Sequence, residues 1–307
     1  MESGLRLKYK FLVHDGPLES YPAVCVKVNF AEVLPKDLAA LRNKGEVQIG
    51  TTADAYQPAE KKYRVTRQTL QVLRDYSFPV SITTKSDLIT RDLDLFSEIA
   101  KKNWCYIEFT IITLDEKLAR WIEPGTPSPQ RRLEAMKKVS DAGIQTGIWI
   151  MPFLPYITDT DENFESVIRA GVENGATFVS GAEVRLREEN IERTHLMKFL
   201  KKYFPELIPK YRKLYGDRVL PDESYILERQ AKLVDLCKKY KINYLPHFYN
   251  RKIALHFYGS GYGRSSKHAQ VLNYFFIRQI LRNVRCKFPT SEFTTKVLSI
   301  LGFFPGP

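Results

Sequence analysis

The stretch Val47-Gln-Ile-Gly-Thr-Thr-Ala-Asp-Ala-Tyr-Gln-Pro-Ala-Glu60 begins with a short β-branched run, ends that run at Gly50 and continues with small hydroxyl and polar residues. A helix-like run, Val65–Tyr76, follows it. In α/β folds, ligands bind in the crevice outside the carboxyl ends of the strands, where strands end in such residues just before a helix. The alternative is an ordinary loop between a strand and a helix, because most loops only connect elements. The stretch therefore predicts an α/β fold and offers one candidate ligand loop.

Strands and helices alternate along the following 150 or so residues, in five strand–helix units. Alternation of this kind implies a parallel sheet with right-handed crossovers, and short runs rich in β-branched and aromatic residues suit strands buried on both faces. The expected strands are residues 47–50, 79–84, 105–112, 146–153 and 178–186. The expected helices are residues 65–76, 92–102, 115–121, 129–142, 161–174 and 189–203.

The composition changes after the fifth unit. Residues 205–215 and 223–240 are expected to form highly charged helices, and residues 242–245 are a candidate extra strand. We therefore expect a barrel-like α/β domain over residues 1–204 and a helical, basic C-terminal extension over residues 205–307.

Bulk properties indicate a globular protein of the cytoplasm. The chain has 307 residues, of which 44% are hydrophobic. It has no apolar run of the roughly 18 residues that a transmembrane helix needs, and its first residues lack the apolar core of a signal peptide. We therefore expect a cytoplasmic location and no membrane partner. The four cysteines are Cys25, Cys105, Cys237 and Cys286. None is spaced from another as in a metal or cluster motif, so we expect buried small apolar residues and no metal ligand in this chain.

The net charge of +12, from 47 basic and 35 acidic residues, predicts a polyanionic partner, of which nucleic acid is the commonest. Surface lysines scattered over the molecule are the alternative explanation. Residues 246–270 interleave aromatic and basic side chains, a composition typical of surfaces on which single-stranded nucleic acid stacks. The same composition also suits a barrel-capping segment with a basic solvent face.

Several candidate binding residues stand at expected strand ends. Lys85 follows the second strand, where a lysine binds a carboxylate or phosphate as a point charge, or is an ordinary solvated loop lysine. Thr110 ends the third strand and offers a hydroxyl, although threonine is also a good strand residue. Arg131 and Arg132 lie in the first turns of a helix, where positive charge is unfavourable, so we expect an anionic partner nearby. Pro152 ends the fourth strand, where proline stops sheet pairing and leaves backbone carbonyls for a ligand.

Seven short motifs occur in a fixed order between residues 49 and 144. They are Ile49-Gly-Thr-Thr-Ala-Asp-Ala-Tyr-Gln-Pro-Ala-Glu60, Leu70-Gln-Val-Leu73, Ile82-Thr-Thr-Lys-Ser86, Arg91-Asp92, Glu123-Pro124, Pro129-Gln-Arg-Arg-Leu133 and Ala142-Gly-Ile144. As an ordered set, they resemble the radical S-adenosylmethionine superfamily, in the branch related to spore photoproduct lyase. The resemblance runs from about Val24 to Arg187, with a weaker continuation to about Tyr240.

This resemblance implies a partial (β/α)6 barrel, TIM-like, that lacks its first βα unit. It also implies a [4Fe-4S] cluster and a lyase-like enzyme that cleaves S-adenosylmethionine reductively to a 5′-deoxyadenosyl radical. An electron donor such as ferredoxin or flavodoxin is implied as a partner. The catalytic residues and the substrate are not implied, and nucleic acid is a candidate substrate.

The resemblance assigns cofactor-binding roles to individual residues. The segment around Thr52 and Asp54 matches the motif that contacts the amino and carboxylate groups of S-adenosylmethionine. Lys85 matches a lysine that pairs with the methionine carboxylate, and Thr110 matches a hydroxyl residue near the ribose.

Two further positions, and one difference, complete this assignment. Arg132 matches an arginine that supports the carboxylate or the barrel mouth, and Pro152 lies where the adenine-side strand ends. In spore photoproduct lyase a hydrogen-donating cysteine precedes the corresponding motif, whereas Gly50 and Thr51 occupy that neighbourhood here. Repair of thymine dimers is therefore not expected.

The cluster motif of the family, C-x-x-x-C-x-x-C, does not occur in this sequence. Five strand–helix units are expected where the family has six. We expect a chain truncated before the cluster loop rather than a member that has lost its cluster, because the other pocket residues are intact. Two alternative functions stay open. One is a cluster-less protein that binds nucleic acid through the barrel mouth and the basic C-terminal segment. The other is a TIM-like enzyme with Lys85 as a base or Schiff-base lysine.

Overall fold

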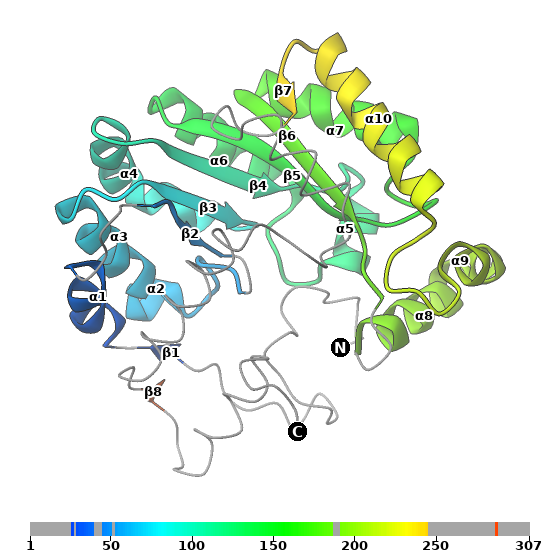
Figure 1. Cartoon of the computed structure of the whole chain (residues 1–307), viewed down its shortest axis with the longest axis horizontal. Helices are drawn as coiled ribbons and strands as arrows, with labels where there is room; N and C mark the ends of the chain where they lie inside the picture. Colours follow the sequence, from blue (N-terminus) through cyan, green and yellow to red (C-terminus); the bar gives the residue numbers. More distant parts are fainter. Residues whose placement is uncertain are drawn as a thin grey trace.

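The main sheet of the protein has six parallel strands, and their order in space is their order in the sequence (Figure 1). The computed structural model describes residues 26–27, 29–39, 45–50, 53–186, 191–244 and 286–287. The strands of this sheet are β2 (Val47–Ile49), β3 (Val80–Thr84), β4 (Cys105–Thr110), β5 (Gln145–Phe153), β6 (Ala176–Glu183) and β7 (Asn243–Tyr244). Short β1 (Val26–Lys27) and β8 (Cys286–Lys287) pair with each other in a separate antiparallel sheet. The predicted α/β class is confirmed, and the sheet of the described residues does not close into a full barrel.

Helices connect successive strands and cover one face of the sheet (Figure 1). They are α1 (Phe30–Ala39), α2 (Glu60–Tyr63), α3 (Val65–Asp75), α4 (Leu93–Ala100), α5 (Glu116–Ile122), α6 (Pro129–Asp141), α7 (Asp161–Glu173), α8 (Ile191–Tyr203), α9 (Ile208–Tyr215) and α10 (Glu223–Lys239), with 3₁₀ turns η2 (Asp87–Asp92) and η3 (Pro205–Leu207). Side-chain caps at Asp115 and Thr160 start α5 and α7 in the loops that follow β4 and β5, and Ser128 caps α6 after α5.

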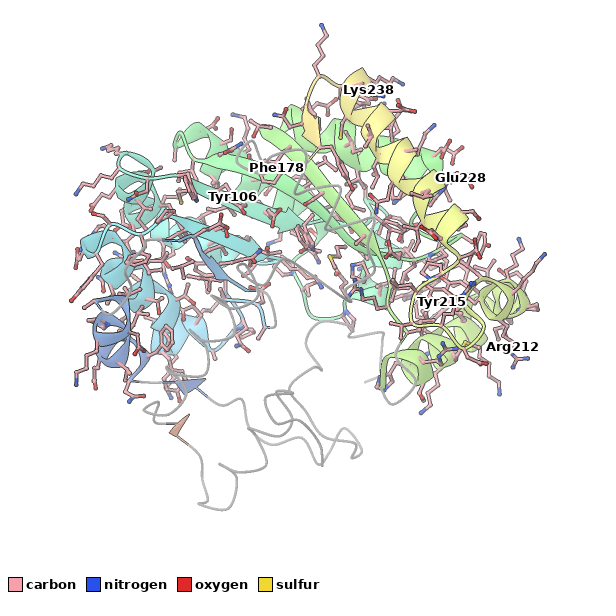
Figure 2. All side chains as sticks on the ribbon, in the orientation of Figure 1. Tyr106, Phe178, Arg212, Tyr215, Glu228 and Lys238 are labelled. Carbon is pink, nitrogen blue, oxygen red and sulfur yellow. The ribbon has the colours of Figure 1, made fainter. Side chains whose placement is uncertain are left out.

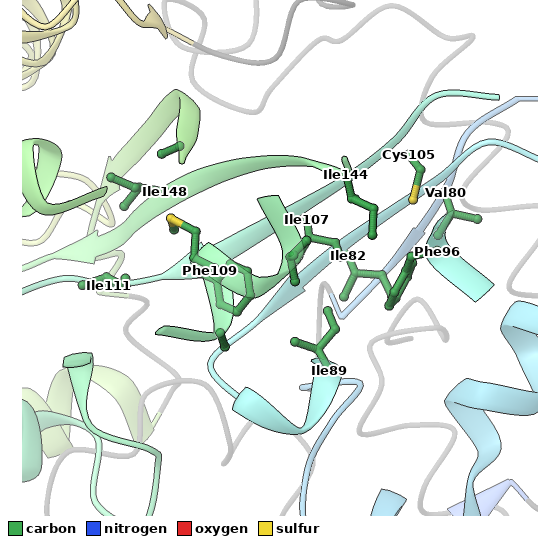
Figure 3. Packing of buried hydrophobic residues seen from close by; sticks show 14 of the residues in the cluster. Val80, Ile82, Ile89, Phe96, Cys105, Ile107, Phe109, Ile111, Ile144 and Ile148 are labelled. Carbon is green, nitrogen blue, oxygen red and sulfur yellow. The ribbon is translucent and has the colours of Figure 1, made fainter. Parts of the chain in front are cut away.

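The two faces of the sheet differ in polarity because side chains alternate along a strand. The helix-covered face carries apolar residues that pack on the helices, among them Val80, Ile82, Ile107, Phe109 and Ile148 (Figure 3). Strands β3 and β4 are buried on both faces, as expected, but the opposite face carries polar residues. These are Ser81, Thr83, Tyr106 and Glu108. Here we call this opposite face the inner face.

The candidate extra strand at residues 242–245 is present as β7, which pairs in parallel with β6. Helix α10 leads into it, and Leu233, Leu236 and Cys237 of α10 lie in the same core cluster as the sheet. Part of the expected C-terminal extension therefore packs on the sheet. The boundary between residues 1–204 and 205–307 stays a prediction, and residues 246–270 lie outside the described part.

A second apolar cluster joins α8 and α9 to the edge formed by the carboxyl ends of the strands, here called the carboxyl edge. Ile112, Leu154 and Val184 follow β4, β5 and β6, and they pack with apolar residues of the two helices. The helix residues are Leu196, Phe199, Leu200, Tyr211, Leu214 and Tyr215, and Leu207 of η3 joins them. Helices α8 and α9 thus lie at the edge where the candidate ligand residues were expected. Among the described residues, no helix has both the length and the apolarity needed to span a bilayer.

Candidate functional site

The turn after β2 requires glycine. Gly50 has a φ of +92°, and a Cβ at this position would lie 2.3 Å from the carbonyl oxygen of Thr83 on β3. Both the left-handed backbone and the close approach exclude a larger residue. The chain therefore leaves β2 in close contact with β3. Thr52, a predicted cofactor-binding residue, lies outside the described residues.

Asp54 links this loop to the end of β3. Its carboxylate accepts hydrogen bonds from Thr84 Oγ1 at 2.7 Å, from the Lys85 backbone N–H at 2.7 Å and from the Tyr56 backbone N–H at 2.8 Å. Three of its acceptor positions are thus used within the protein. Asp54 lies at the carboxyl end of the strands, as predicted. Its hydrogen bonds fix the backbone at Lys85.

The Lys85 side chain turns inward and is only 6% exposed. Its Nζ lies 2.6 Å from Glu123 Oε1, and the other oxygen, Oε2, lies 2.6 Å from Nη1 of Arg132. Glu123 follows α5, and Arg132 is in the second turn of α6. We call Lys85, Glu123 and Arg132 the mouth cluster. In it two buried cations share one carboxylate at the ends of β3 and β4.

Arg132 is the largest fully buried side chain among the described residues, and several groups hold it. Its guanidinium donates to the backbone carbonyl of Thr110 at 2.8 Å, to the carbonyl of Pro127 at 2.9 Å and to Thr126 Oγ1. Thr110, the last residue of β4, is itself 1% exposed. Arg132 therefore connects the end of β4 to Glu123, and through Glu123 to Lys85.

The anionic partners expected for the paired arginines are groups of the protein itself. Glu123 pairs with Arg132. Asp87 of η2 accepts a hydrogen bond from Arg131, with an Nε–Oδ2 distance of 3.0 Å. Burial alone would raise the pKa of Glu123, but the charges of Lys85 and Arg132 outweigh it and lower this pKa to about 2. Glu123 is therefore ionised over the whole physiological pH range.

A second buried ion cluster lies behind the loop. Tyr56, Glu60, Arg67, Arg91 and Asp92 form it, and we call it the loop cluster. Arg91 lies 2.8 Å from Glu60 and 2.7 Å from Asp92, and Arg67 lies 2.8 Å from Asp92. The Tyr56 hydroxyl donates to Asp92 at 3.0 Å. Burial would raise the pKa of Asp92, but hydrogen bonds from the two arginines hold it below its usual value.

The inner face of the sheet carries two carboxylates that the sequence analysis did not single out. Glu108 of β4 is 2% exposed and accepts hydrogen bonds from Thr83 Oγ1 at 3.0 Å and Ser180 Oγ at 3.1 Å. Glu46 accepts from the Tyr106 hydroxyl at 2.9 Å. Glu108 and Thr110 alternate on β4, so Glu108 lies on the same face as Thr110 and one step further from the carboxyl edge.

Pro152 does not end β5. The strand continues to Phe153, which pairs with Glu183 of β6, and the Met151–Pro152 peptide bond is cis. The pairing register shifts between Ile150 and Phe153. The expectation that proline stops pairing is therefore corrected to a local irregularity, after which pairing resumes. Pro152 lies on β5, one strand beyond the strand ends that carry the mouth cluster.

The two cysteines whose side chains are described, Cys105 and Cys237, do not fit an iron–sulfur cluster. Cys105 and Cys237 are free and buried, and burial raises the pKa of each thiol to about 12. A cluster needs thiolate ligands grouped around one centre. Among the described residues, no group of three or more His, Cys, Asp or Glu is placed to hold a metal ion.

Part of the chain is similar to a known protein family. Residues 31–170 match the family model described as the radical SAM superfamily. An uncharacterised protein of Mycobacterium tuberculosis is 32% identical over 220 residues, which cover 71% of this chain and 64% of the relative. An uncharacterised protein of Methanocaldococcus jannaschii is 34% identical over 130 residues, covering 42% of this chain and 49% of that protein. The chain thus spans less than two thirds of these relatives.

Solved structures resemble this fold. A spore photoproduct lyase mutant matches with a TM-score of 0.56 at 16% identity. The match covers 78% of this chain and 72% of the mutant's chain. A second mutant, with bound S-adenosylmethionine and a dinucleoside spore photoproduct, matches with a TM-score of 0.54 at 17% identity, covering 72% and 66%. At such identity the likeness concerns the fold.

Proposed function

We propose that the carboxyl edge binds S-adenosylmethionine, with Lys85 receiving the methionine carboxylate, because residues 31–170 match the radical SAM superfamily. The mouth cluster is the observation that carries the proposal. A lysine that is 6% exposed and fixed at a strand end by a buried carboxylate is placed to bind one more anion. Two cations for one carboxylate leave this group of three side chains positively charged.

Each residue of the site has a distinct part in this proposal. Lys85 supplies the charge for the methionine carboxylate, and Glu123 fixes the direction of its ammonium group. Arg132 holds Glu123 and the end of β4, while Asp54 holds the backbone of Lys85. Thr110 offers its hydroxyl on the inner face, where we place the ribose.

The proposal is limited to binding. The described residues supply no ligands for a [4Fe-4S] cluster, so no step of reductive cleavage is derived for this chain. A Schiff-base role for Lys85 gains no support from the geometry. Its Nζ is held in a buried ion pair with the Glu123 carboxylate.

Isothermal titration calorimetry with S-adenosylmethionine tests the proposal. We expect Lys85→Met to weaken binding by about tenfold or more, which corresponds to one charge-assisted contact. Lys101→Met, an exposed lysine, is the matched control and should bind like the original chain. Decarboxylated S-adenosylmethionine should bind the original chain and Lys85→Met equally. A Lys85→Met effect of the same size on both ligands would show that the carboxylate is not what Lys85 binds.

A further inference from the structure

Helices α8 and α9 form a basic surface beside the candidate site. Between Arg193 and Tyr215 the sequence has seven lysines and arginines and a single acidic residue, Glu206. Six of these cationic residues are exposed, namely Lys198, Lys201, Lys202, Lys210, Arg212 and Lys213. Figure 2 shows Arg212 and Tyr215 on α9, with the Arg212 side chain on the outside. About half of the formal net charge of the whole chain is thus concentrated on two short helices.

The cations of this surface differ from those of the neighbouring helix α10. On α10, Arg229 and Lys232 pair with Asp161, and Lys239 pairs with Glu165. By contrast, no carboxylate of the described residues lies within 4.0 Å of several cations on α8 and α9. These are Lys198, Lys201, Lys210, Arg212 and Lys213. Like charges on one surface repel each other, and a polyanion relieves this repulsion.

Aromatic side chains extend the surface to the loops of the carboxyl edge. Trp121 of α5 stacks on Tyr203 of α8 with a centroid distance of 4.3 Å, and Lys117 lies 5.1 Å from the Trp121 ring. Beyond the end of β5, Lys210 lies 5.5 Å from the ring of Tyr156. Trp121 is two residues before Glu123 of the mouth cluster. The basic surface therefore borders the candidate site.

The helix pair is rigidly attached at this edge. Tyr211 donates a hydrogen bond to the carbonyl of Pro155 at 2.8 Å, and Tyr215 donates to the carbonyl of Val184 at 2.8 Å. The apolar residues of both helices are buried in the second core cluster. Helices that bind a membrane surface need an exposed apolar face, and no large exposed hydrophobic residue of the described chain lies on α8 or α9. A soluble polyanion fits this surface better than a lipid surface.

We propose that the exposed cations of α5, α8 and α9 bind the phosphate backbone of a nucleic acid and place it at the carboxyl edge. The contact is with phosphates, so it is strongly salt-dependent and carries little sequence preference. This contact does not require S-adenosylmethionine. Its test is therefore independent of the proposed binding of that molecule.

Fluorescence anisotropy with labelled 20-nucleotide single strands and 20-base-pair duplexes tests the proposal at several salt concentrations. The variant Lys201→Glu/Lys210→Glu/Lys213→Glu should bind about tenfold or more weakly, and the slope of log affinity against log salt should shrink by about 2–3. The matched control is Lys101→Glu/Lys102→Glu/Lys138→Glu. These three exposed lysines lie at the ends of α4 and α6, near the opposite edge of the sheet. The control changes the net charge equally but leaves α8 and α9 unchanged, so it should retain binding to within about threefold.

Circular dichroism melting curves check that both triple variants fold. Equal losses in the two variants would assign binding to net charge alone and overturn the proposal. Absence of binding by the original chain would overturn it as well. Binding to vesicles that contain phosphatidylserine, without binding to either oligonucleotide, would reassign the surface to anionic lipid.

Discussion

The two buried ion clusters at the carboxyl edge differ in how their charges balance. In the loop cluster, Arg67 and Arg91 face the buried carboxylates of Glu60 and Asp92, so cations and anions are equal in number. In the mouth cluster, Lys85 and Arg132 both pair with Glu123, so these three side chains carry two positive charges and one negative charge. Both clusters consist of residues from the same ordered set of motifs, apart from Arg67. Motif residues thus divide into a balanced scaffold and a cationic site.

The balance matters because a buried charge is costly unless it is paired. A fully paired buried cluster contributes little net stability, and its effect is to fix one arrangement of the chain. The loop cluster fixes residues 54–60 against η2 in this way. Two cations on one carboxylate are less favourable, and groups with a strongly shifted pKa, such as Glu123, are enriched at functional sites. The difference in charge balance is consistent with the proposed binding at the mouth cluster and with a supporting part for the loop cluster.

Asp92→Asn should have the largest effect on stability. Asp92 is fully buried and accepts from Arg67, Arg91 and Tyr56, so its loss leaves two guanidinium groups without their shared anion. We expect the free energy of unfolding to fall by about 3–5 kcal/mol. Urea unfolding followed by circular dichroism measures it. A loss below about 1 kcal/mol would mean that the loop cluster is not the scaffold described here.

Glu123→Gln should cost less stability and more binding. Glutamine keeps the shape and one acceptor oxygen but loses the charge that two cations share. We expect about 2–3 kcal/mol of destabilisation, in the range of hydrogen bonds to charged groups. Calorimetry should show weaker binding of S-adenosylmethionine, because Lys85 loses its fixed direction. If Asp92→Asn weakened binding more than Glu123→Gln at equal folded fraction, the division between scaffold and site would be wrong.

The pH dependence of unfolding separates Glu123 from other carboxylates. An unfolded glutamate has a pKa of about 4.3, and that of Glu123 in the folded protein is about 2. Its stabilising contribution is therefore complete above pH ~4.5 and is lost as the pH falls towards 2. The stability difference between the original chain and Glu123→Gln should shrink over this interval, by at most about 1.4 kcal/mol per pH unit. Urea midpoints at pH 6, 4.5 and 3 measure it, and a constant difference would contradict the assignment.

Strand-end rules were sufficient to place part of the site. Asp54, Lys85 and Thr110 follow or end neighbouring parallel strands, so their proximity follows from the sheet alone. The part of Glu123 could not be predicted from its motif, because its approach to Lys85 depends on the length and direction of α5. The pairing of Tyr56 with Asp92, 36 residues apart, depends in the same way on tertiary packing.

The sequence does indicate the polar inner face, through alternation of polar and apolar residues in β3 and β4. The expectation of strands buried on both faces left this alternation without an interpretation. Val80-Ser-Ile-Thr-Thr84 and Tyr106-Ile-Glu-Phe-Thr110 alternate polar or amphipathic residues with apolar ones. Such alternation predicts one apolar and one polar face. Interpreted as strands buried on both faces, these runs gave no role to Glu108. The irregular pairing at Pro152 had no comparable signal, because it depends on the partner strand β6.

Asp94→Asn should have the smallest effect on the free energy of unfolding, and it separates the part of burial from the part of Arg67. Asp94 binds the same Arg67 as Asp92, at 2.7 Å, but its side chain is 54% exposed. Water and salt screen such a pair, so we expect a change of only about 0–1 kcal/mol in the free energy of unfolding. Asp92→Asn, measured in the same urea series, is the comparison. Each variant removes the charge of one carboxylate partner of Arg67, but Asp92 is buried and Asp94 is exposed. Equal losses in the two variants would show that Arg67, rather than the burial of Asp92, sets the strength of the loop cluster.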